Sequence, residues 1–438
     1  MRTILRGCSA HDRGLLARDG LLGGIRELKA ALILSRLLDR VLVPPTLSRT
    51  RAGRGLTVNA IRSALGLLLV AGTIHMASPR WSAGGVTDKP AGLNPLLIQQ
   101  KPGTWMRLPR GSGPTPRRIP RHAGGVIDPA TSILYFFGSD NHGDEWNNEV
   151  WRYDPVAMAW TQSYPEDAPS TYLYLDGRKT TTTGHPWAMH TFAMNAWDAA
   201  GGRLVMGAWQ MHYGLESLPQ VKLPRGAPES WWQYEPVGNA WTPAAQGPDL
   251  GLGHLCYVPS LGRVIGFSGD NIPVTLYDPA KRTFEAFSGF FGKAPDGYTL
   301  RSAYDSRRDR ILLVSWDKGP NVWAFDLKKK RWSNLGVQHR PRGGIYGSWD
   351  YDQSADAIVS LWPDDPAGGF SNESGKSRTF LVDLGRNAYT EIRTDPAPPY
   401  TGLSFRVLYD PRHEVTFAVE GNEVWSFKAP SLAANRPF

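Results

Sequence analysis

The sequence predicts an all-β fold, a six-bladed β-propeller of four-stranded antiparallel blades that spans residues 100–430. Three observations lead to this prediction. Two short motifs recur along the region, and the last repeat lacks one strand that a segment at the start of the region can supply. A unit of strands and tight turns that recurs about every 40 to 50 residues is typical of a propeller blade.

The first motif is an aromatic residue or Val, followed directly by an acidic residue, with an aromatic residue seven positions after the first. It occurs at Tyr153-Asp154 with Trp160, Tyr234-Glu235 with Trp241, Tyr277-Asp278 with Phe284, Phe325-Asp326 with Trp332, and Val382-Asp383 with Tyr389. The constant spacing predicts two strands joined by a tight turn, which would be the third and fourth strands of each blade.

The second motif is an Asp followed six residues later by an apolar strand. It occurs at Asp128 with Leu134, Asp198 with Leu204, Asp305 with Ile311, Asp352 with Ile358, and Asp410 with Thr416, while Val258-Pro259 takes the place of the Asp in the third copy. Asp and Pro are favoured at the first two positions of type I turns. This motif therefore predicts the first and second strands of six blades.

The sixth repeat is incomplete, because it has three predicted strands and no aromatic partner after Trp425. The segment around Trp105 resembles the fourth strands that contain Trp160 and Trp241. We expect this N-terminal strand to complete the sixth blade and close the ring, which would protect an otherwise open sheet edge.

The first 82 residues differ in composition from the rest. They hold 13 Lys and Arg against four Asp and Glu, which accounts for the whole net charge of +9, since the remaining residues hold 36 of each. Three arginines precede an apolar run at 64–74 and a group of small residues, as in a secretory signal peptide. We expect a signal peptide or N-terminal hydrophobic segment at 58–82 and a secreted or periplasmic protein. Residues 1–57 are expected to be a gene-model extension or a disordered leader, with a genuine leader or anchor helix as the alternative.

Charge and cysteine content limit the partners of the propeller. A neutral region with no basic stripe gives no reason to expect nucleic acid, and the 11-residue apolar run is shorter than the about 20 residues that a membrane-spanning helix needs. We therefore expect no nucleic-acid partner and no integral membrane domain in the propeller. Cys256 would be the single cysteine after processing, so no internal disulfide is expected.

The repeats resemble the kelch repeat and, more broadly, the galactose-oxidase-like propeller superfamily. The resemblance covers residues 100–428 and rests on the segment from Val150 to Trp160 and on Asp128 with Tyr135-Phe136-Phe137-Gly138. The Gly-Gly pair that usually follows the second strand in this family is reduced here to Gly138-Ser139 or Ser268-Gly269. The chain is therefore similar to a divergent kelch-type propeller.

Long connections mark one face of the predicted propeller. The connections after the second and fourth strands of a blade share a face, and the longest ones are 162–187, 209–230 and 362–377. Binding and catalysis usually occur in long loops on a rigid scaffold. The predicted ligand-binding residues are mostly polar and aromatic residues of this face: His142, Asp144, Trp146, His185, Trp187, Trp209, His212, Trp316, Asp317, Trp349 and Trp362. They suit a saccharide, because flat rings stack on sugars, or they pack the loops themselves.

His122, His190 and His254 lie at or near the start of the innermost strands of successive blades. If they converge, they form a ligand-binding or metal cluster. Otherwise, each bonds a neighbouring backbone. His190 with Tyr213 and Arg301 gives a candidate catalytic set of the lyase kind, in which His or Tyr is the base and Arg neutralises a uronate carboxylate.

No cofactor is predicted, and copper and calcium are the two metals that the sequence partly suggests. Copper would follow from the galactose-oxidase resemblance, and Cys256-Tyr257 and His212-Tyr213 have the residue types without the sequence context. Calcium is suggested by the acidic segment 139–145, which lacks the spacing of a specific calcium loop.

Two functions are compatible with these observations. The first is an exported kelch-type propeller that binds a carbohydrate or protein partner on its loop-rich face. The second is a carbohydrate-active enzyme on the same scaffold, either lyase-like or oxidase-like. The fold alone does not distinguish them.

Overall fold

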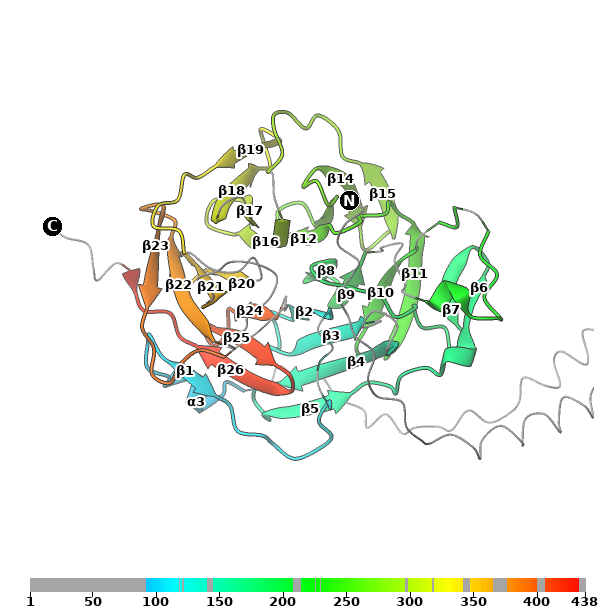
Figure 1. The fold of residues 1–438 in the computed structure, drawn as a ribbon, viewed down its shortest axis with the longest axis horizontal. Helices are drawn as coiled ribbons and strands as arrows, with labels where there is room; N and C mark the ends of the chain where they lie inside the picture. Colours follow the sequence, from blue (N-terminus) through cyan, green and yellow to red (C-terminus); the bar gives the residue numbers. More distant parts are fainter. Residues whose placement is uncertain are drawn as a thin grey trace, which may run out of the picture. The chain divides into compact units, whose positions relative to one another are not determined.

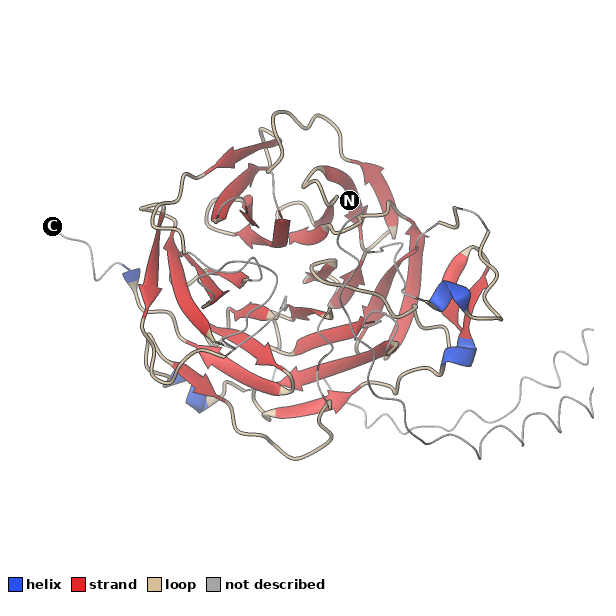
Figure 2. Cartoon of the chain, in the orientation of Figure 1, coloured by secondary structure: helices blue, strands red, loops and turns tan. Residues whose placement is uncertain are grey.

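The computed structural model describes residues 92–432, apart from 118, 120–121, 140–144, 208–213, 225, 229, 296–297, 317–318, 342–346, 365–375 and 400–405. Six four-stranded antiparallel sheets are arranged around a central axis, as Figures 1 and 2 show. The prediction of an all-β, six-bladed propeller is confirmed. Helix in the described residues comprises α3 (Pro95–Ile98), two 3-10 turns, η2 (Pro169–Thr171) and η3 (Leu215–Ser217), and Leu432 in 3-10 conformation near the C-terminus.

Five blades each consist of four consecutive strands. Blade one is β2 (Gly124–Ile127), β3 (Leu134–Ser139), β4 (Asn147–Asp154) and β5 (Ala159–Gln162). Blade two is β8 (Asn195–Asp198), β9 (Arg203–Met206), β10 (Ser230–Glu235) and β11 (Ala240–Gln246). Blade three is β12 (His254–Val258), β13 (Arg263–Phe267), β14 (Pro273–Asp278) and β15 (Thr283–Ala286). Blade four is β16 (Tyr298–Asp305), β17 (Arg310–Trp316), β18 (Pro320–Asp326) and β19 (Arg331–Asn334). Blade five is β20 (Ser348–Asp352), β21 (Ala357–Pro363), β22 (Ser377–Asp383) and β23 (Ala388–Ile392).

The sixth sheet combines both ends of the propeller. Its order is β24 (Val407–Asp410), β25 (Val415–Glu420), β26 (Glu423–Phe427) and β1 (Trp105–Arg107). Trp105 lies opposite Phe427, and its indole Nε1 donates a 2.8 Å hydrogen bond to Thr379 Oγ1 of blade five. The innermost strands β2, β8, β12, β16, β20 and β24 contact one another in sequence, and β24 contacts β2, so that they form a ring.

The first sequence motif forms the turn between the third and fourth strands. In all five copies the two residues seven positions apart are direct cross-strand partners, from Tyr153 and Trp160 to Val382 and Tyr389. The fourth residue after the acid has a positive φ, between 47° and 56°, in every copy: Met158, Asn239, Arg282, Lys330 and Asn387. The recurrent spacing therefore encodes one hairpin geometry.

The acid of this turn binds the backbone. Asp326 Oδ1 accepts hydrogen bonds from the N–H groups of Lys328, at 3.0 Å, and Lys329, at 2.8 Å. The backbone bond from Lys329 is the main cause that lowers the pKa of Asp326 below its ordinary value of 3.8. The charged carboxylate is thus the form that stabilises the turn.

We expect Asp326→Ala to lower the free energy of unfolding at pH 7 by about 1–2 kcal/mol, since two hydrogen bonds of about 0.5–1.5 kcal/mol each are lost. Because the folded pKa of Asp326 is depressed, the difference from wild type should be full above pH 3.8 and shrink as the pH falls below it. Urea unfolding at pH 7 and pH 3 measures both effects. Asp270→Ala, at an exposed turn, is the matched control. A pH-independent difference would contradict this account.

A fully buried polar network joins blades one and six. Ser132 Oγ donates to Asp410 Oδ1 at 2.9 Å, and His413 Nδ1 lies 2.5 Å from Asp410 Oδ2. The backbone N–H of Asn94 donates to His413 Nε2 at 3.0 Å. Ser, His and Asp are the residue types of a hydrolytic triad, but all three are 0% exposed and Nε2 is occupied by a backbone donor. The network is therefore structural.

An extra hairpin interrupts the repeat between blades one and two. It consists of β6 (Tyr172–Leu175) and β7 (Arg178–Thr181), and it lies at the periphery near β11 (Figure 1). In the part of the chain that the structure describes, no helix is long and apolar enough to cross a membrane.

Candidate functional site

A cleft of about 760 Å³ opens on the face that carries the long connections, hereafter the loop face. It forms where the connection into β4 meets the connection that follows β5. Besides Arg117, its lining residues are Glu145, Trp146, Asn147, Glu149, Trp151, Glu166, Asp167, Ala168 and Pro169. The loop-face cleft thus combines two indole rings with an amide and four acidic side chains, against one basic side chain.

Glu149 is a buried acid of the cleft. Its side chain lies on β4, the residue is 8% exposed, and Oε1 accepts a 3.2 Å hydrogen bond from Trp151 Nε1. Its Oε2 has no hydrogen-bond partner among the described residues. Burial, together with the neighbouring Glu166 and Glu145, raises the pKa of Glu149 above 4.5. Glu149 can therefore hold a proton at a pH where an ordinary carboxyl group has lost it.

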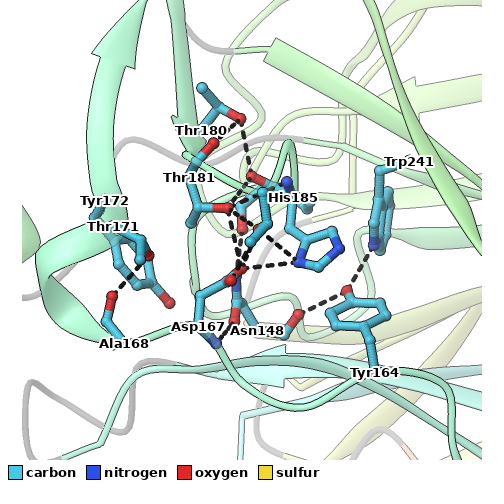
Figure 3. Close-up of polar contacts among 12 residues, drawn as sticks. Asn148, Tyr164, Asp167, Ala168, Thr171, Tyr172, Thr180, Thr181, His185 and Trp241 are labelled. Carbon is cyan, nitrogen blue, oxygen red and sulfur yellow. Dashed lines mark hydrogen bonds and ion pairs between the residues drawn. The ribbon is translucent and has the colours of Figure 1, made fainter. Parts of the chain in front are cut away.

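Asp167 holds the wall of the cleft in place (Figure 3). Its Oδ2 accepts hydrogen bonds from Asn148 Nδ2 at 2.9 Å and Thr181 Oγ1 at 3.0 Å, and lies 2.8 Å from His185 Nδ1. Thr183 Oγ1 contacts both carboxylate oxygens. Burial alone would raise the pKa of Asp167, but the hydrogen bonds from His185, Asn148 and Thr183 outweigh burial and lower it. Asp167 is therefore a charged anchor rather than a proton donor.

Aromatic groups of the inter-blade connection and of blade two support this anchor. The His185 ring stacks on Tyr164 at a centroid distance of 3.9 Å. Tyr164 Oη donates to Asn148 O at 2.7 Å and accepts from Trp241 Nε1 at 2.6 Å, as Figure 3 shows. The segment that supplies Glu166 and Asp167 is thus fixed to blades one and two at once.

We expect Glu149→Gln to be more stable than wild type at pH 7 and equally stable below pH 4.5. The raised pKa of folded Glu149 means that the native state binds the proton more tightly than the unfolded state. Wild-type stability therefore falls as the pH rises from 4.5 through the folded pKa, and Gln removes this loss. Denaturant unfolding at pH 4 and pH 7 tests the expectation, with Glu285→Gln on exposed strand β15 as the control. Parallel pH profiles for wild type and Glu149→Gln would contradict it.

The predicted loop-face residues have different environments. Trp146 lines the cleft, and His185 is bound to Asp167 behind it. Trp187, Trp349 and Trp362 are at most 1% exposed. Trp316 is partly exposed and packs on Trp362. The predicted residues His142, Asp144, Trp209, His212, Tyr213 and Asp317 lie outside the described residues, as does most of the candidate calcium segment.

Two of the three histidines predicted at the start of the innermost strands contact each other. The rings of His122 and His190 stack at a centroid distance of 3.9 Å, and both contact the edge of Phe192. His254 instead contacts Ser302 Oγ at 2.9 Å and stacks on Phe267, and burial lowers its pKa to about 3. Throughout the described ranges, no three His, Cys, Asp or Glu side chains are grouped so that they could hold a metal ion.

Arg301 lies apart from the loop-face cleft. It projects from β16 into a second cavity on the propeller axis, where it pairs with Asp350 of blade five. His190 and Arg301 are absent from the lining of the cleft.

Sequence patterns missed three of the four acids of the cleft, Glu149, Glu166 and Asp167. Glu149 and Glu166 belong to no repeated motif, and Asp167 acts through partners up to 19 residues away. One signal was present: Asn147-Asn148-Glu149 is a run of polar residues at the start of a strand. A run of polar residues at the end of a strand indicates side chains that do not pack in the apolar core and are candidates for a functional site.

The fold and this cleft define a six-bladed β-propeller with a polar, aromatic cleft on its loop face. No protein-family model matches the chain, and no curated protein matches it in sequence. Among solved structures, it is similar to a GH74 enzyme from Niastella koreensis (14% identity, TM-score 0.41, 71% of this chain and 46% of that one). It is also similar to an auxiliary nutrient binding protein from Bacteroides ovatus (11% identity, TM-score 0.43, 74% of this chain and 76% of that one). A third similar structure is a GH74 xyloglucanase from Xanthomonas campestris (12% identity, TM-score 0.41, 74% of this chain and 53% of that one). The chain spans about half of each GH74 enzyme, and these similarities concern the fold alone.

Proposed function

We propose that the protein is an exported, divergent kelch-type propeller that binds a saccharide in the loop-face cleft. The observation that carries this proposal is the lining of the cleft, where Trp146 and Trp151 lie beside the Asn147 amide and the carboxyl groups of Glu149 and Glu166. Indole rings offer flat apolar surfaces to sugar rings, while amide and carboxyl groups accept and donate hydrogen bonds to hydroxyls. The proposal of export rests on the N-terminal apolar run at 64–74, outside the described residues.

The negative charge of the cleft limits which saccharides it can bind. Four acidic side chains and a single arginine line the cleft. An anionic sugar such as a uronate would be repelled, whereas a neutral sugar or an amino sugar would not. The proposed ligand is therefore a neutral or amino-bearing oligosaccharide.

Binding of three oligosaccharide probes tests the proposal. Calorimetry with cellotetraose, a chitosan tetramer and tetragalacturonate should show binding of one of the first two and none of the third. Trp146→Ala should weaken binding about tenfold, since one aromatic contact contributes about 0.5–1.5 kcal/mol beyond its buried area. Glu285→Gln is the control. Absence of binding to any probe at millimolar concentration, or a preference for tetragalacturonate, would overturn it.

Glu149 supports a second candidate, a carbohydrate-active enzyme. A buried carboxyl group whose pKa is raised beside other carboxylates has the property required of a general acid. Chromatography of the same oligosaccharides after incubation distinguishes the two functions. A binding protein leaves them intact, whereas an enzyme of this kind shortens them and Glu149→Gln abolishes the reaction.

A further inference from the structure

The second cavity lies on the propeller axis and has a volume of about 490 Å³. All six innermost strands line it. The turns that follow them contribute Pro129, Ala199, Pro259, Ser306, Gln353 and Pro411. Because these turns lie at the end of each strand away from the long connections, this axial cavity opens on the face opposite the loop-face cleft. Its volume falls within the range of about 300–1,000 Å³ that is common for small-molecule sites.

One cation and one anion face each other in the axial cavity. Arg301 Nη2 lies 3.4 Å from Asp350 Oδ2, and Arg301 Nη1 donates to Val407 O at 3.1 Å. Asp350 also accepts the backbone N–H groups of Tyr351 and Tyr409, both at 2.9 Å. The guanidinium has five N–H donors, of which these contacts use two, and a carboxylate has about four acceptor sites, of which they use three. The pair can therefore still bind a carboxylate and an ammonium group.

Two residues of β8 with buried polar groups also line the cavity. Both amide atoms of Asn195 and the indole Nε1 of Trp197 lack hydrogen-bond partners among the described residues. Each residue is 8% exposed. Because these atoms are fully buried, they lie behind the cavity surface and offer no contact to a ligand in the cavity.

The backbone beside these groups is strained. Phe192 lines the same cavity and has φ of 41°, which is unfavourable for a bulky residue. Its N–H donates to His122 O at 3.0 Å, which connects β8 with the start of blade one. Strained residues of this kind cluster at ligand sites.

We propose that the axial cavity is a binding site for a small α-amino acid with an apolar side chain. Arg301 would bind its carboxylate and Asp350 its ammonium group. Val126, Ile127 and Leu255 are apolar lining residues that suit the side chain. The balanced charges disfavour a purely anionic or cationic ligand, and the apolar walls disfavour a saccharide. This site is independent of the proposed saccharide cleft.

Three nearly isosteric probes test the chemistry. L-Phenylalanine carries both charged groups, 3-phenylpropionate only the carboxylate and 2-phenylethylamine only the amine. Calorimetry with each at concentrations up to about 10 mM should show binding of phenylalanine and at least about tenfold weaker binding of the other two, because each lacks a charge-assisted contact. No binding of phenylalanine, or equal binding of either single-charge probe, would overturn the proposal.

Two variants locate the site. Arg301→Gln should weaken phenylalanine binding at least about tenfold. Asp350→Asn, which keeps the size of the side chain and removes its charge, should also weaken phenylalanine binding at least about tenfold. The second variant keeps the test valid if the first does not fold. Glu285→Gln serves as the control, and undiminished binding by Asp350→Asn would overturn the assignment.

Discussion

Replacing His413 by Ala is expected to lower the free energy of unfolding by about 3–5 kcal/mol, the range for breaking a buried polar pair by removing one partner. His413 and Asp410 are both 0% exposed, and the ring bridges Asp410 Oδ2 and the N–H of Asn94. The variant leaves a buried carboxylate oxygen and a buried N–H without partners and adds a cavity. Asn94 also donates to Pro155 O at 2.6 Å, so the loss weakens the junction between blades one and six.

Guanidinium chloride unfolding of the purified protein at pH 7 measures this loss. The matched control is His339→Asn, because His339 is exposed and has a positive φ that Asn tolerates. The control should change the free energy of unfolding by no more than about 0.5 kcal/mol. A loss below about 1 kcal/mol for His413→Ala would show that the network does not hold the two blades together.

The fold could be predicted because each repeated motif corresponds to one local structure. Tyr153 and Trp160 are seven residues apart because they are opposite each other across a hairpin of fixed length. Local contacts of this kind leave a spacing in the sequence that a single chain reveals. The same reasoning indicated where long connections lie, which is the face that carries the cleft.

The cleft could be only partly predicted because its contacts are not local. Asn148 and Asp167 are 19 residues apart in an irregular connection, and no period links them. Arg301 and Asp350 meet because β16 and β20 are neighbouring inner strands, and their pairing depends on how two blades pack. Residue type alone also does not predict burial. Trp362 is one of the predicted loop-face residues, and it is 1% exposed and packs so closely on Gly347 that a Cβ there would lie 2.2 Å from its ring.

Replacing Asp167 by Ala should release the wall of the loop-face cleft. The carboxylate accepts hydrogen bonds from Asn148, Thr181 and Thr183 and contacts His185, so its loss leaves several buried donors without a partner. Hydrogen bonds to a charged group contribute about 1.5–3 kcal/mol each, and we expect a net loss of about 2–4 kcal/mol in the stability of the inter-blade segment. Saccharide binding in the cleft should fall at least about tenfold, because Glu166 is displaced with it.

Trypsin cleavage after Arg178, at the start of β7, reports this local release. The cleavage rate at pH 7 should rise at least about tenfold in Asp167→Ala, since cleavage of a transiently open segment follows its opening free energy. Asp176→Asn, at the tip of the same hairpin, is the control and should leave the rate unchanged. Because the pKa of folded Asp167 is lowered, its stabilising effect is complete above pH 3.8 and is lost as the pH falls below that value. An unchanged cleavage rate in Asp167→Ala at pH 7 would show that Asp167 does not hold the segment, and the cleft would then need another support.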